Sequence, residues 1–134
     1  MLIELDRYQE NDSPYKYTLT LLPHRETRSY TLKQRGILLK KVEKLFAENS
    51  DCGFTPQGQK VWQQILADDQ YAKLLKQYAQ GEFLVTVTIP GEASFEGIVK
   101  DFYRFDTTVY VVSGTSHRIV SAAYVTAREG EEDV

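Results

Sequence analysis

The residues best suited to chemistry in this chain are basic side chains gathered between positions 24 and 44. Seven lysines and arginines face two glutamates there, so this stretch carries +5, while the remainder of a chain whose total is −3 carries −8. Such a local positive field can attract phosphate groups in a salt-dependent, sequence-independent way. A solvated helix face is the alternative interpretation. The basic residues are Arg25, Arg28, Lys33, Arg35, Lys40, Lys41 and Lys44.

A second candidate interface mixes aromatic and basic side chains near the C-terminal end. Aromatic rings can stack on nucleobases, which contributes about 1–3 kcal/mol per base. Packing within a small barrel is the alternative for Phe102, Phe105 and Tyr110. The mixed set is Tyr103, Arg104, Phe105, Tyr110 and Arg118. Across the whole chain, the candidate nucleic-acid-binding residues are Arg25, Arg28, Lys33, Lys40, Lys44, Tyr103, Arg104 and Arg118.

Catalytic chemistry is not indicated by the sequence. Ser116 and His117 are adjacent, and neighbouring residues on a strand point to opposite faces, so they do not make a nucleophile–base pair. Asp101 and Asp106 flank a turn, where aspartate commonly caps the backbone. The glycines are scattered and form no phosphate-binding loop. We therefore expect a protein that is not an enzyme.

Metal, disulfide and membrane chemistry are not indicated either. Cys52, His24 and His117 lie far apart, which does not match the spacing of a zinc site, and we expect no cofactor. A single cysteine makes no intrachain disulfide. Acidic residues within the first fifteen positions argue against a secretory signal, and no apolar run reaches the roughly 20 residues of a membrane span. The expected location is the cytoplasm.

The elements that must position these residues begin with two strands. Residues 1–7 favour a short strand, and residues 15–22 alternate between apolar and polar side chains until Pro23 ends the run. The apolar side of the second strand would be Tyr15, Tyr17, Leu19 and Leu21. The two strands predict an antiparallel ribbon, which must pack on another element because an isolated ribbon is marginally stable.

A first helix follows the ribbon. Residues 31–34 match a capping box, so we expect a helix from there to about Glu48. At 100° per residue, Lys33, Lys40 and Lys44 would fall within about 40° of one another on a face separate from the apolar stripe. This helix would therefore present three lysines together.

A second helix is predicted by Thr55 and Pro56, an N-cap followed by proline, and Gly81 would end it. Its apolar stripes at 61–66 and 71–78 lie nearly opposite each other on one continuous helix. Either the helix breaks at Asp68-Asp69, where aspartate is a good N-cap, or one helix is held between two partners. We favour the break.

From residue 83 onward the period of the apolar residues changes to two, which predicts strands. The expected strands are 83–89, 94–103, 108–112, 117–121 and 124–127. Five short strands must curl, and a closed or nearly closed barrel leaves the fewest unpaired edges. Gly97, inside the second of these strands, fits a bend at a barrel corner.

The order of apolar residues and glycines in this segment also carries a resemblance. The residues concerned are Val85-Thr86-Val87, Gly91, Phe95-Glu96-Gly97-Ile98-Val99, Phe102-Tyr103-Arg104-Phe105, Val109-Tyr110-Val111-Val112 and Tyr124-Val125. In this order the segment resembles the Sm-like small barrel of the LSm and Hfq proteins, which implies a helix, five strands and association with RNA. In length and element order the chain is also similar to the YolD-like family of bacteria, phages and plasmids, which implies a DNA-damage or polymerase-accessory setting.

The expected fold is α+β, with an N-terminal β-ribbon, two or three helices and a C-terminal five-stranded Sm/SH3-like barrel. The parts would be residues 1–80, the barrel at 81–128 and an acidic tail at 129–134, within one compact domain overall. We expect an accessory protein of bacterial, phage or plasmid origin that binds DNA or RNA. The alternative is an adaptor or self-assembling module without nucleic-acid binding, whose strand edges at 108–112 and 124–127 pair with a protein partner or a second copy.

Overall fold

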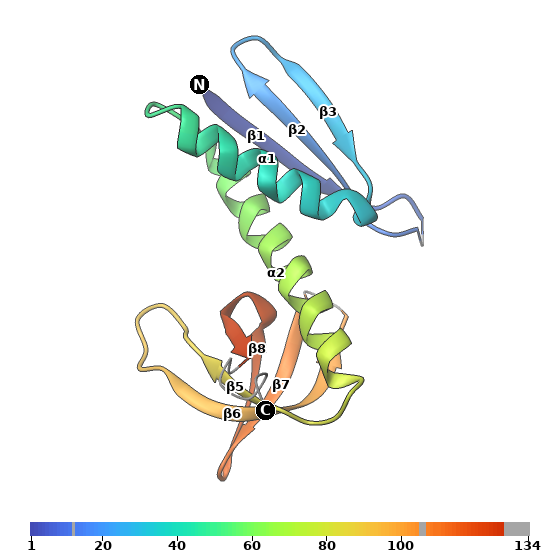
Figure 1. Cartoon of the computed structure of the whole chain (residues 1–134), viewed down its shortest axis with the longest axis vertical. Coiled ribbons are helices and arrows are strands. Elements are labelled where there is room, and N and C mark those ends of the chain that lie inside the picture. Colours follow the sequence, from blue (N-terminus) through green and yellow to red (C-terminus); the bar gives the residue numbers. More distant parts are fainter. Residues whose placement is uncertain (12, 105–106, 128–134) are drawn as a thin grey trace. The chain divides into compact units, whose positions relative to one another are not determined.

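The structure is a computed structural model that describes residues 1–11, 13–104 and 107–127 (Figure 1). These residues form an α+β arrangement of two α-helices and two β-sheets, as the sequence predicts. The chain divides into two compact units, residues 1–65 and residues 66–134, and the division falls within the second helix. Each unit has its own sheet and its own apolar core.

The first unit contains a four-stranded sheet in the order β3-β2-β1-β4. The predicted antiparallel ribbon is confirmed as β1 and β2, with Ile3 opposite Leu21 and Leu5 opposite Leu19. Two strands were not predicted: β3 pairs antiparallel with β2, and the two-residue β4 pairs parallel with β1. The strands are β1 (Leu2–Tyr8), β2 (Lys16–Leu22), β3 (Glu26–Tyr30) and β4 (Gly53–Phe54).

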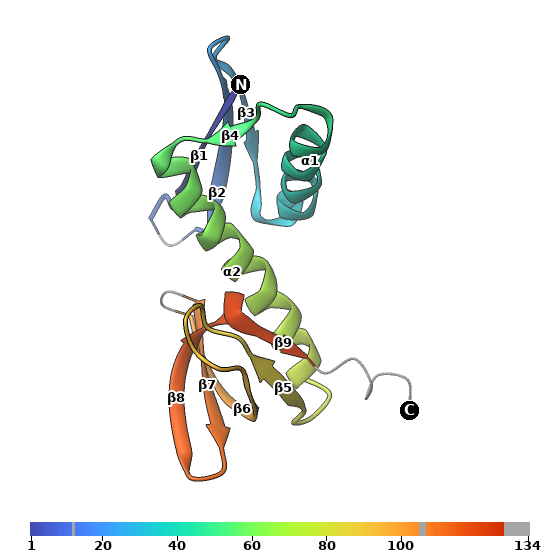
Figure 2. The ribbon, with the colours of Figure 1, turned by 90° about the vertical axis from the view of Figure 1, so that its left-hand side faces the viewer.

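The core of the first unit lies on one face of this sheet, where helix α1 (Arg35–Glu48) packs (Figure 2). The alternation of β2 predicts that face correctly, since Tyr17 and Leu19 are buried. Apolar residues of α1 at a helical spacing complete the layer, together with the first turns of the second helix. The buried side chains of this core are Ile3, Leu5, Tyr17, Leu19, Tyr30, Leu38, Val42, Leu45, Val61 and Ile65.

The start of α1 differs in detail from the predicted one. The capping box is present, with the Gln34 side-chain oxygen accepting from the Thr31 N–H at 3.0 Å. Residues 32–34, however, form a 3₁₀ turn, and the α-helix begins at Arg35. Lys33 therefore precedes the α-helix, and the predicted common face of Lys33, Lys40 and Lys44 holds only for the two lysines within it, because a 3₁₀ turn has a different period.

Helix α2 (Pro56–Tyr78) starts as predicted, with the Thr55 hydroxyl accepting from the Gly58 N–H at 2.9 Å. The predicted break at Asp68-Asp69 is wrong, because α2 runs through both residues without interruption. Asp69 is held inside the helix by an ion pair with Lys73 at 3.2 Å. Aspartate can cap a helix, but it accepts an interior position when a lysine follows four residues later.

The two apolar stripes of α2 belong to different cores, which corresponds to the alternative of one helix with two partners. Val61 and Ile65 are buried in the core of the first unit. Leu74 is buried in the core of the second unit, with Tyr71 packed against it. Each stripe faces its own core, so the two stripes can lie on different sides of one continuous helix without a break.

The second unit contains a five-stranded antiparallel sheet in the order β8-β7-β6-β5-β9 (Figure 2). All five predicted strands are present, and the predicted separator at residues 122–123 is a 3₁₀ turn, Ala122–Tyr124. The strands are β5 (Leu84–Val87), β6 (Phe95–Tyr103), β7 (Thr108–Ser113), β8 (Ser116–Ser121) and β9 (Val125–Ala127).

This sheet is not closed into a barrel, because β8 and β9 lie at its two ends and are not paired with each other over the described residues. The predicted edge at 108–112 is wrong: it is β7, which pairs with β6 on one side and β8 on the other. The predicted edge at 124–127 does coincide with a terminal strand, β9. The free edges therefore belong to β8 and β9.

Gly97 allows the close approach of two strands at the middle of β6. A Cβ atom there would lie 2.6 Å from Cγ1 of Val111 and 2.8 Å from the carbonyl oxygen of Val112. Residues 95–98 of β6 pair with β5, and residues 98–103 pair with β7, so the partner changes next to this glycine. The register of β6 on β7 shifts between Val99 and Asp101. The close approach explains why a glycine stands at this position, and the predicted bend at a barrel corner stays a prediction.

The core of the second unit is built largely from valines on the inner face of the sheet. Gln70 of α2 donates from Nε2 to the Val125 carbonyl at 2.7 Å, which ties the helix to β9. Phe102 packs edge-on against Tyr71 and Tyr78 at centroid distances of 5.6 Å and 5.2 Å. The buried residues are Leu74, Val85, Val87, Val99, Val109, Val111, Val120, Ala122 and Val125. Phe105, Asp106 and the acidic tail lie outside the described residues.

Neither helix in the described part of the chain is long and apolar enough to cross a membrane. Within the same residues, no group of three or more His, Cys, Asp or Glu side chains is placed to hold a metal ion. Cys52 is a free, partly buried thiol that packs against the first core.

Candidate nucleic-acid interface

The basic residues between positions 25 and 44 all lie on the first unit. Arg25 sits in the turn between β2 and β3, with φ at +57°, and is exposed. Arg28 lies on β3, and Lys33 lies in the turn before α1. The remaining lysines and Arg35 lie on α1. Five of the eight candidate residues, Arg25, Arg28, Lys33, Lys40 and Lys44, therefore belong to one compact unit.

One side of α1 gathers its lysines next to β3. At 100° per residue, Lys40 and Lys44 are about 40° apart, and Lys41 lies about 60° beyond Lys44 toward the buried stripe. Lys40 and Lys44 are exposed, while Lys41 is partly buried and lines a pocket together with Arg28 of β3. We call this surface the basic strip and define it as Arg28, Lys40, Lys41 and Lys44.

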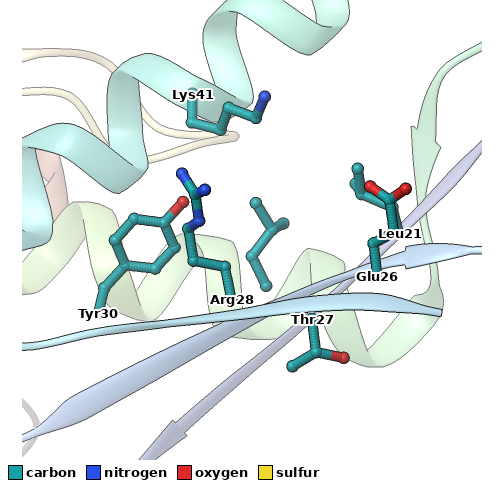
Figure 3. A pocket seen from close by; sticks show the side chains of 7 residues that line it. Leu21, Glu26, Thr27, Arg28, Tyr30 and Lys41 are labelled. Atoms are coloured by element: carbon teal, nitrogen blue, oxygen red, sulfur yellow. The ribbon is translucent and has the colours of Figure 1, made fainter.

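The pocket within the basic strip has a volume of about 190 Å³ and opens between β3 and α1 (Figure 3). Arg28 and Tyr30 extend from β3 toward the side where Lys41 lies, whereas Thr27 extends to the other side. Glu26 stands at the end of the pocket near Leu21. The lining residues are Leu19, Leu21, Glu26, Thr27, Arg28, Tyr30 and Lys41.

The strand register explains why these side chains share one pocket. Tyr30, Arg28 and Glu26 are opposite Tyr17, Leu19 and Leu21 of β2. Alternate residues of a strand point to one face, so the three β3 side chains project on the core side of the sheet. Because β3 is the edge strand, the ends of Arg28 and Glu26 reach solvent there, and both residues are exposed.

The charges of the basic strip are weakly compensated. Within residues 1–11, 13–104 and 107–127, no ion pair engages Arg28, Lys40 or Lys41, and the same holds for Arg25 and Lys33. Lys44 has an exposed partner, Glu48, at 3.9 Å, and exposed pairs of this type contribute about 0–1 kcal/mol. These cations are therefore available to an anion from outside the protein.

Tyr30 adds a buried hydrogen-bonding group to the pocket. Its side chain belongs to the core and the residue is 4% exposed, yet none of the described residues is hydrogen-bonded to its hydroxyl. No fully buried side-chain nitrogen or oxygen in the described part lacks a partner, so the Tyr30 oxygen has some contact with solvent, and its side chain points to the side where Arg28 and Lys41 lie. Lys41 and Tyr30 were not among the predicted binding residues, because their convergence depends on β3, which the sequence did not predict.

The candidate residues of the second unit do not form one mixed surface. Arg118 is opposite Val111 and so projects with the core face of the sheet, whereas Tyr110 projects to the outer face. The Arg118 guanidinium pairs with both carboxylate oxygens of Glu92, at 3.0 Å and 3.4 Å, and its Cζ lies 5.4 Å from the centre of the Phe95 ring. Arg118 is thus engaged within the protein.

The end of β6 carries the two other candidates of this unit. Tyr103 is 38% exposed, and Arg104 is exposed in the turn that follows. Nearby, burial raises the pKa of Tyr71, while the positive charge of Arg104 lowers it and the negative charge of Asp101 raises it. Arg104 is therefore close enough to Tyr71 to act on it electrostatically, which places it beside the packed aromatic cluster.

His117 contacts Tyr110 instead of its neighbour Ser116. The Tyr110 hydroxyl and His117 Nδ1 are hydrogen-bonded across β7 and β8, and the two rings are 5.7 Å apart. This agrees with the expectation that Ser116 and His117 point to opposite faces. The pair joins two strands on the outer face of the sheet.

Of the predicted residues of the first unit, Arg28 lines the pocket and Lys40 and Lys44 lie on α1, whereas Arg25 and Lys33 lie outside the basic strip. Two cations and a phenol hydroxyl share one pocket there, and these groups donate hydrogen bonds that suit an anion. No protein-family model, curated protein or solved structure matches this chain.

Proposed function

We propose that this protein is a non-enzymatic accessory protein that binds nucleic acid through the basic strip of its first unit. The observation that carries the proposal is the meeting of Arg28 and Lys41 at one solvent-facing pocket with no ion-pair partner among the described residues. Two like charges that line one pocket repel each other, and an arriving phosphate relieves that repulsion.

The remaining cations extend the same surface. Lys40 and Lys44 follow on the exposed side of α1, so a phosphate backbone that enters the pocket meets further positive charge. Backbone contacts of this kind do not read bases, and their affinity falls steeply with salt. We therefore expect binding to DNA and RNA with little sequence preference.

For the second unit we propose an Sm- or SH3-like small barrel. Its strand order and the short 3₁₀ turn between β8 and β9 support this, as does the glycine at the change of partner in β6. Small barrels of this type serve as platforms for nucleic acids and proteins. In the proposed function this unit attaches the nucleic-acid-binding unit to its biological target.

The proposal is tested by measuring binding of labelled DNA and RNA to the whole chain by fluorescence anisotropy. The triple variant Lys40→Glu, Lys41→Glu and Lys44→Glu should lose binding, because a phosphate would meet three negative charges. A matched control carries the same charge change on α2, at the exposed residues Lys60, Lys73 and Lys76. It should retain most of the binding, and circular dichroism establishes that both variants fold. Equal losses in the two variants would argue against a specific strip.

A second candidate function, protein interaction, is favoured by one observation on β8. This strand is paired on one side only, and its Ile119 is 61% exposed on the outer face. Unpaired backbone groups on an edge strand can accept another strand. Sedimentation of the pure chain tests this: self-association that Ile119→Lys abolishes would support edge pairing, and a monomer at all concentrations would oppose self-assembly.

A further inference from the structure

The two cations of the pocket between β3 and α1 can contact the same anion, which distinguishes them from the rest of the basic strip. Lys40 and Lys44 are exposed, and each can meet a phosphate on an open helix surface. Arg28 and Lys41 instead line one volume of about 190 Å³, so a single anion can contact both. A guanidinium binds phosphate through two parallel N–H groups, and an ammonium adds a mobile point charge.

The two cations of this pocket, Arg28 and Lys41, fit a phosphate that ends a chain better than one inside it. An internal phosphodiester carries one negative charge, whereas a phosphate monoester carries about −1.5 to −2 at neutral pH. Arg28 and Lys41 together can pair with the two negative charges of a monoester, while Glu26 lies at the end of the pocket near Leu21. A monoester also has three free oxygens, which suffice for Arg28, Lys41 and the Tyr30 hydroxyl together.

Tyr30 supplies the observation that is independent of charge. Its side chain is buried, lines the pocket and points to the side of Arg28 and Lys41, and its hydroxyl has no hydrogen-bond partner among the described residues. A buried tyrosine usually finds a hydrogen-bond partner for its hydroxyl. Here the ring is fixed by the core, so the hydroxyl is a rigid donor placed beside the two cations, and a ligand oxygen is the natural acceptor.

Glu26 limits what can follow the phosphate. Its carboxylate lines the same pocket at the end near Leu21. A second phosphate on the ligand would extend toward or past this negative charge and be repelled. The pocket therefore favours one phosphate over a diphosphate or triphosphate.

We propose that the pocket formed by Arg28, Tyr30 and Lys41 binds the terminal phosphate monoester of a nucleic-acid strand. This rests on the proposed function, because Lys40 and Lys44 of the same strip would hold the adjoining backbone. The protein would thereby prefer phosphorylated strand ends to intact strands. A free mononucleotide has the same monoester and is distinguished from a strand end by the experiment.

The test compares oligonucleotides of one sequence with a 5′-phosphate, a 3′-phosphate or hydroxyls at both ends, each labelled internally. At physiological salt, one of the phosphorylated strands should bind the whole chain at least about tenfold more tightly than the hydroxyl strand, which corresponds to about 1.4 kcal/mol. Adenosine 5′-monophosphate should compete far more weakly than that strand, since it lacks the backbone that the lysines contact. Competition at equal concentration would overturn the assignment to strand ends.

Variants assign the preference to the pocket. Tyr30→Phe removes the hydroxyl alone and should reduce the preference for the phosphorylated strand several-fold. Tyr15→Phe is the matched control, because Tyr15 does not line the pocket. The Tyr15 ring packs against Arg7, whose Cζ lies 3.7 Å from the ring centre. This variant should behave as wild type. Lys41→Gln should lower the preference, whereas Lys40→Gln should weaken the binding of all strands equally.

The failures of the two proposals are distinguishable. If the wild-type chain binds all three oligonucleotides equally and in a salt-dependent manner, the phosphate pocket is overturned and the proposed function stands. If it binds none of them at low salt, the proposed function falls as well. A preference that persists unchanged in Tyr30→Phe and Lys41→Gln would place the recognition elsewhere and overturn this assignment.

Discussion

Several basic residues of the two units differ in whether a carboxylate pairs with them. In the second unit, Arg118 pairs with Glu92 at 3.0 Å and Lys100 pairs with Glu82 at 2.8 Å. In the first unit, Arg28, Lys40 and Lys41 have no ion-pair partner within the described residues. Residue types alone do not separate these two situations, because each region contains both basic and acidic side chains. What separates these particular cations is whether the fold places a carboxylate within ion-pair distance of them.

Glycine substitutions should produce the largest effects and should separate the two units. A Cβ at Gly58 would lie 2.6 Å from the Ile3 carbonyl oxygen in the first unit, and one at Gly97 would lie 2.6 Å from Val111 in the second. Gly58→Ala and Gly97→Ala should each destabilise their own unit by about 1–3 kcal/mol, because a packed site must shift.

Hydrogen exchange followed on separate peptides measures this difference. Gly58→Ala should reduce protection in β1 and in the first turns of α2, and Gly97→Ala should reduce it in β6 and β7. Trp62 is the single tryptophan, and its ring centre lies 5.6 Å from that of Phe54. It gives a fluorescence signal for the first unit. Unchanged protection in both variants would contradict the close approaches described above.

A carboxylate added to the first unit should give its lysines the ion-pair partners that Arg118 and Lys100 have in the second unit. Ile37 is 60% exposed and lies one turn before Lys40 and Lys41 on α1. Ile37→Glu would give both lysines a partner at the favourable i, i+3 and i, i+4 spacings and add about 0.2–0.5 kcal/mol per pair to helix stability. Affinity for DNA should fall about tenfold, or about 1.4 kcal/mol, when measured by anisotropy.

Ile37→Gln is the control for this substitution, since it changes polarity without charge and should retain the affinity of the wild type. If Ile37→Glu were to bind DNA as well as Ile37→Gln does, the uncompensated charge of the strip would not be the source of binding.

A carboxylate removed from the second unit should have a smaller effect. Glu92→Gln leaves Arg118 without its ion pair, but the Arg118 side chain is 41% exposed, so water replaces much of the interaction. We expect a loss of less than about 1 kcal/mol in the free energy of unfolding, measured with denaturant, and no gain in DNA affinity. A loss of several kcal/mol would show that this pair organises the sheet.

The smallest expected effect concerns Tyr71. Burial raises the pKa of Tyr71 above its ordinary value of 10.0, so the folded state holds this proton more tightly than the unfolded state. The contribution of this proton to the free energy of unfolding is fully present below the ordinary pKa and is lost as the pH rises through the pKa of the folded state. As the pH rises above 10.0, the wild type should lose more stability than Tyr71→Phe. Equal losses in a urea titration would contradict this.

The sequence predicted those parts of the fold that local patterns determine. Five strands could be located from alternating residues, such as Val85 and Val87, and from the turn residues after each run. The alternation is present because only one face of that sheet is buried. It missed β3, since Glu26–Tyr30 has no apolar alternation and becomes a strand by pairing with β2. It also placed a break at Asp68-Asp69, because local capping preference does not reveal that one helix serves two cores.

The candidate site could be predicted in part for the same reason. The cluster of basic residues is visible in the sequence, and Arg28 was among the predicted residues. The pocket was not visible, because it requires the register of β3 on β2 and the placement of Lys41 over Arg28 and Tyr30. Likewise, the ion pair of Arg118 joins residues 26 positions apart, which local reasoning does not connect.

The salt dependence of DNA binding tests the central claim most directly, namely that uncompensated cations of the first unit contact phosphates. The logarithm of the association constant should fall linearly with the logarithm of salt concentration, with a slope of about −3 to −4 for three or four contacts. In the triple charge reversal of Lys40, Lys41 and Lys44, binding should be lost at every salt concentration. A slope near zero for the wild type, or an unchanged slope in that variant, would contradict the claim.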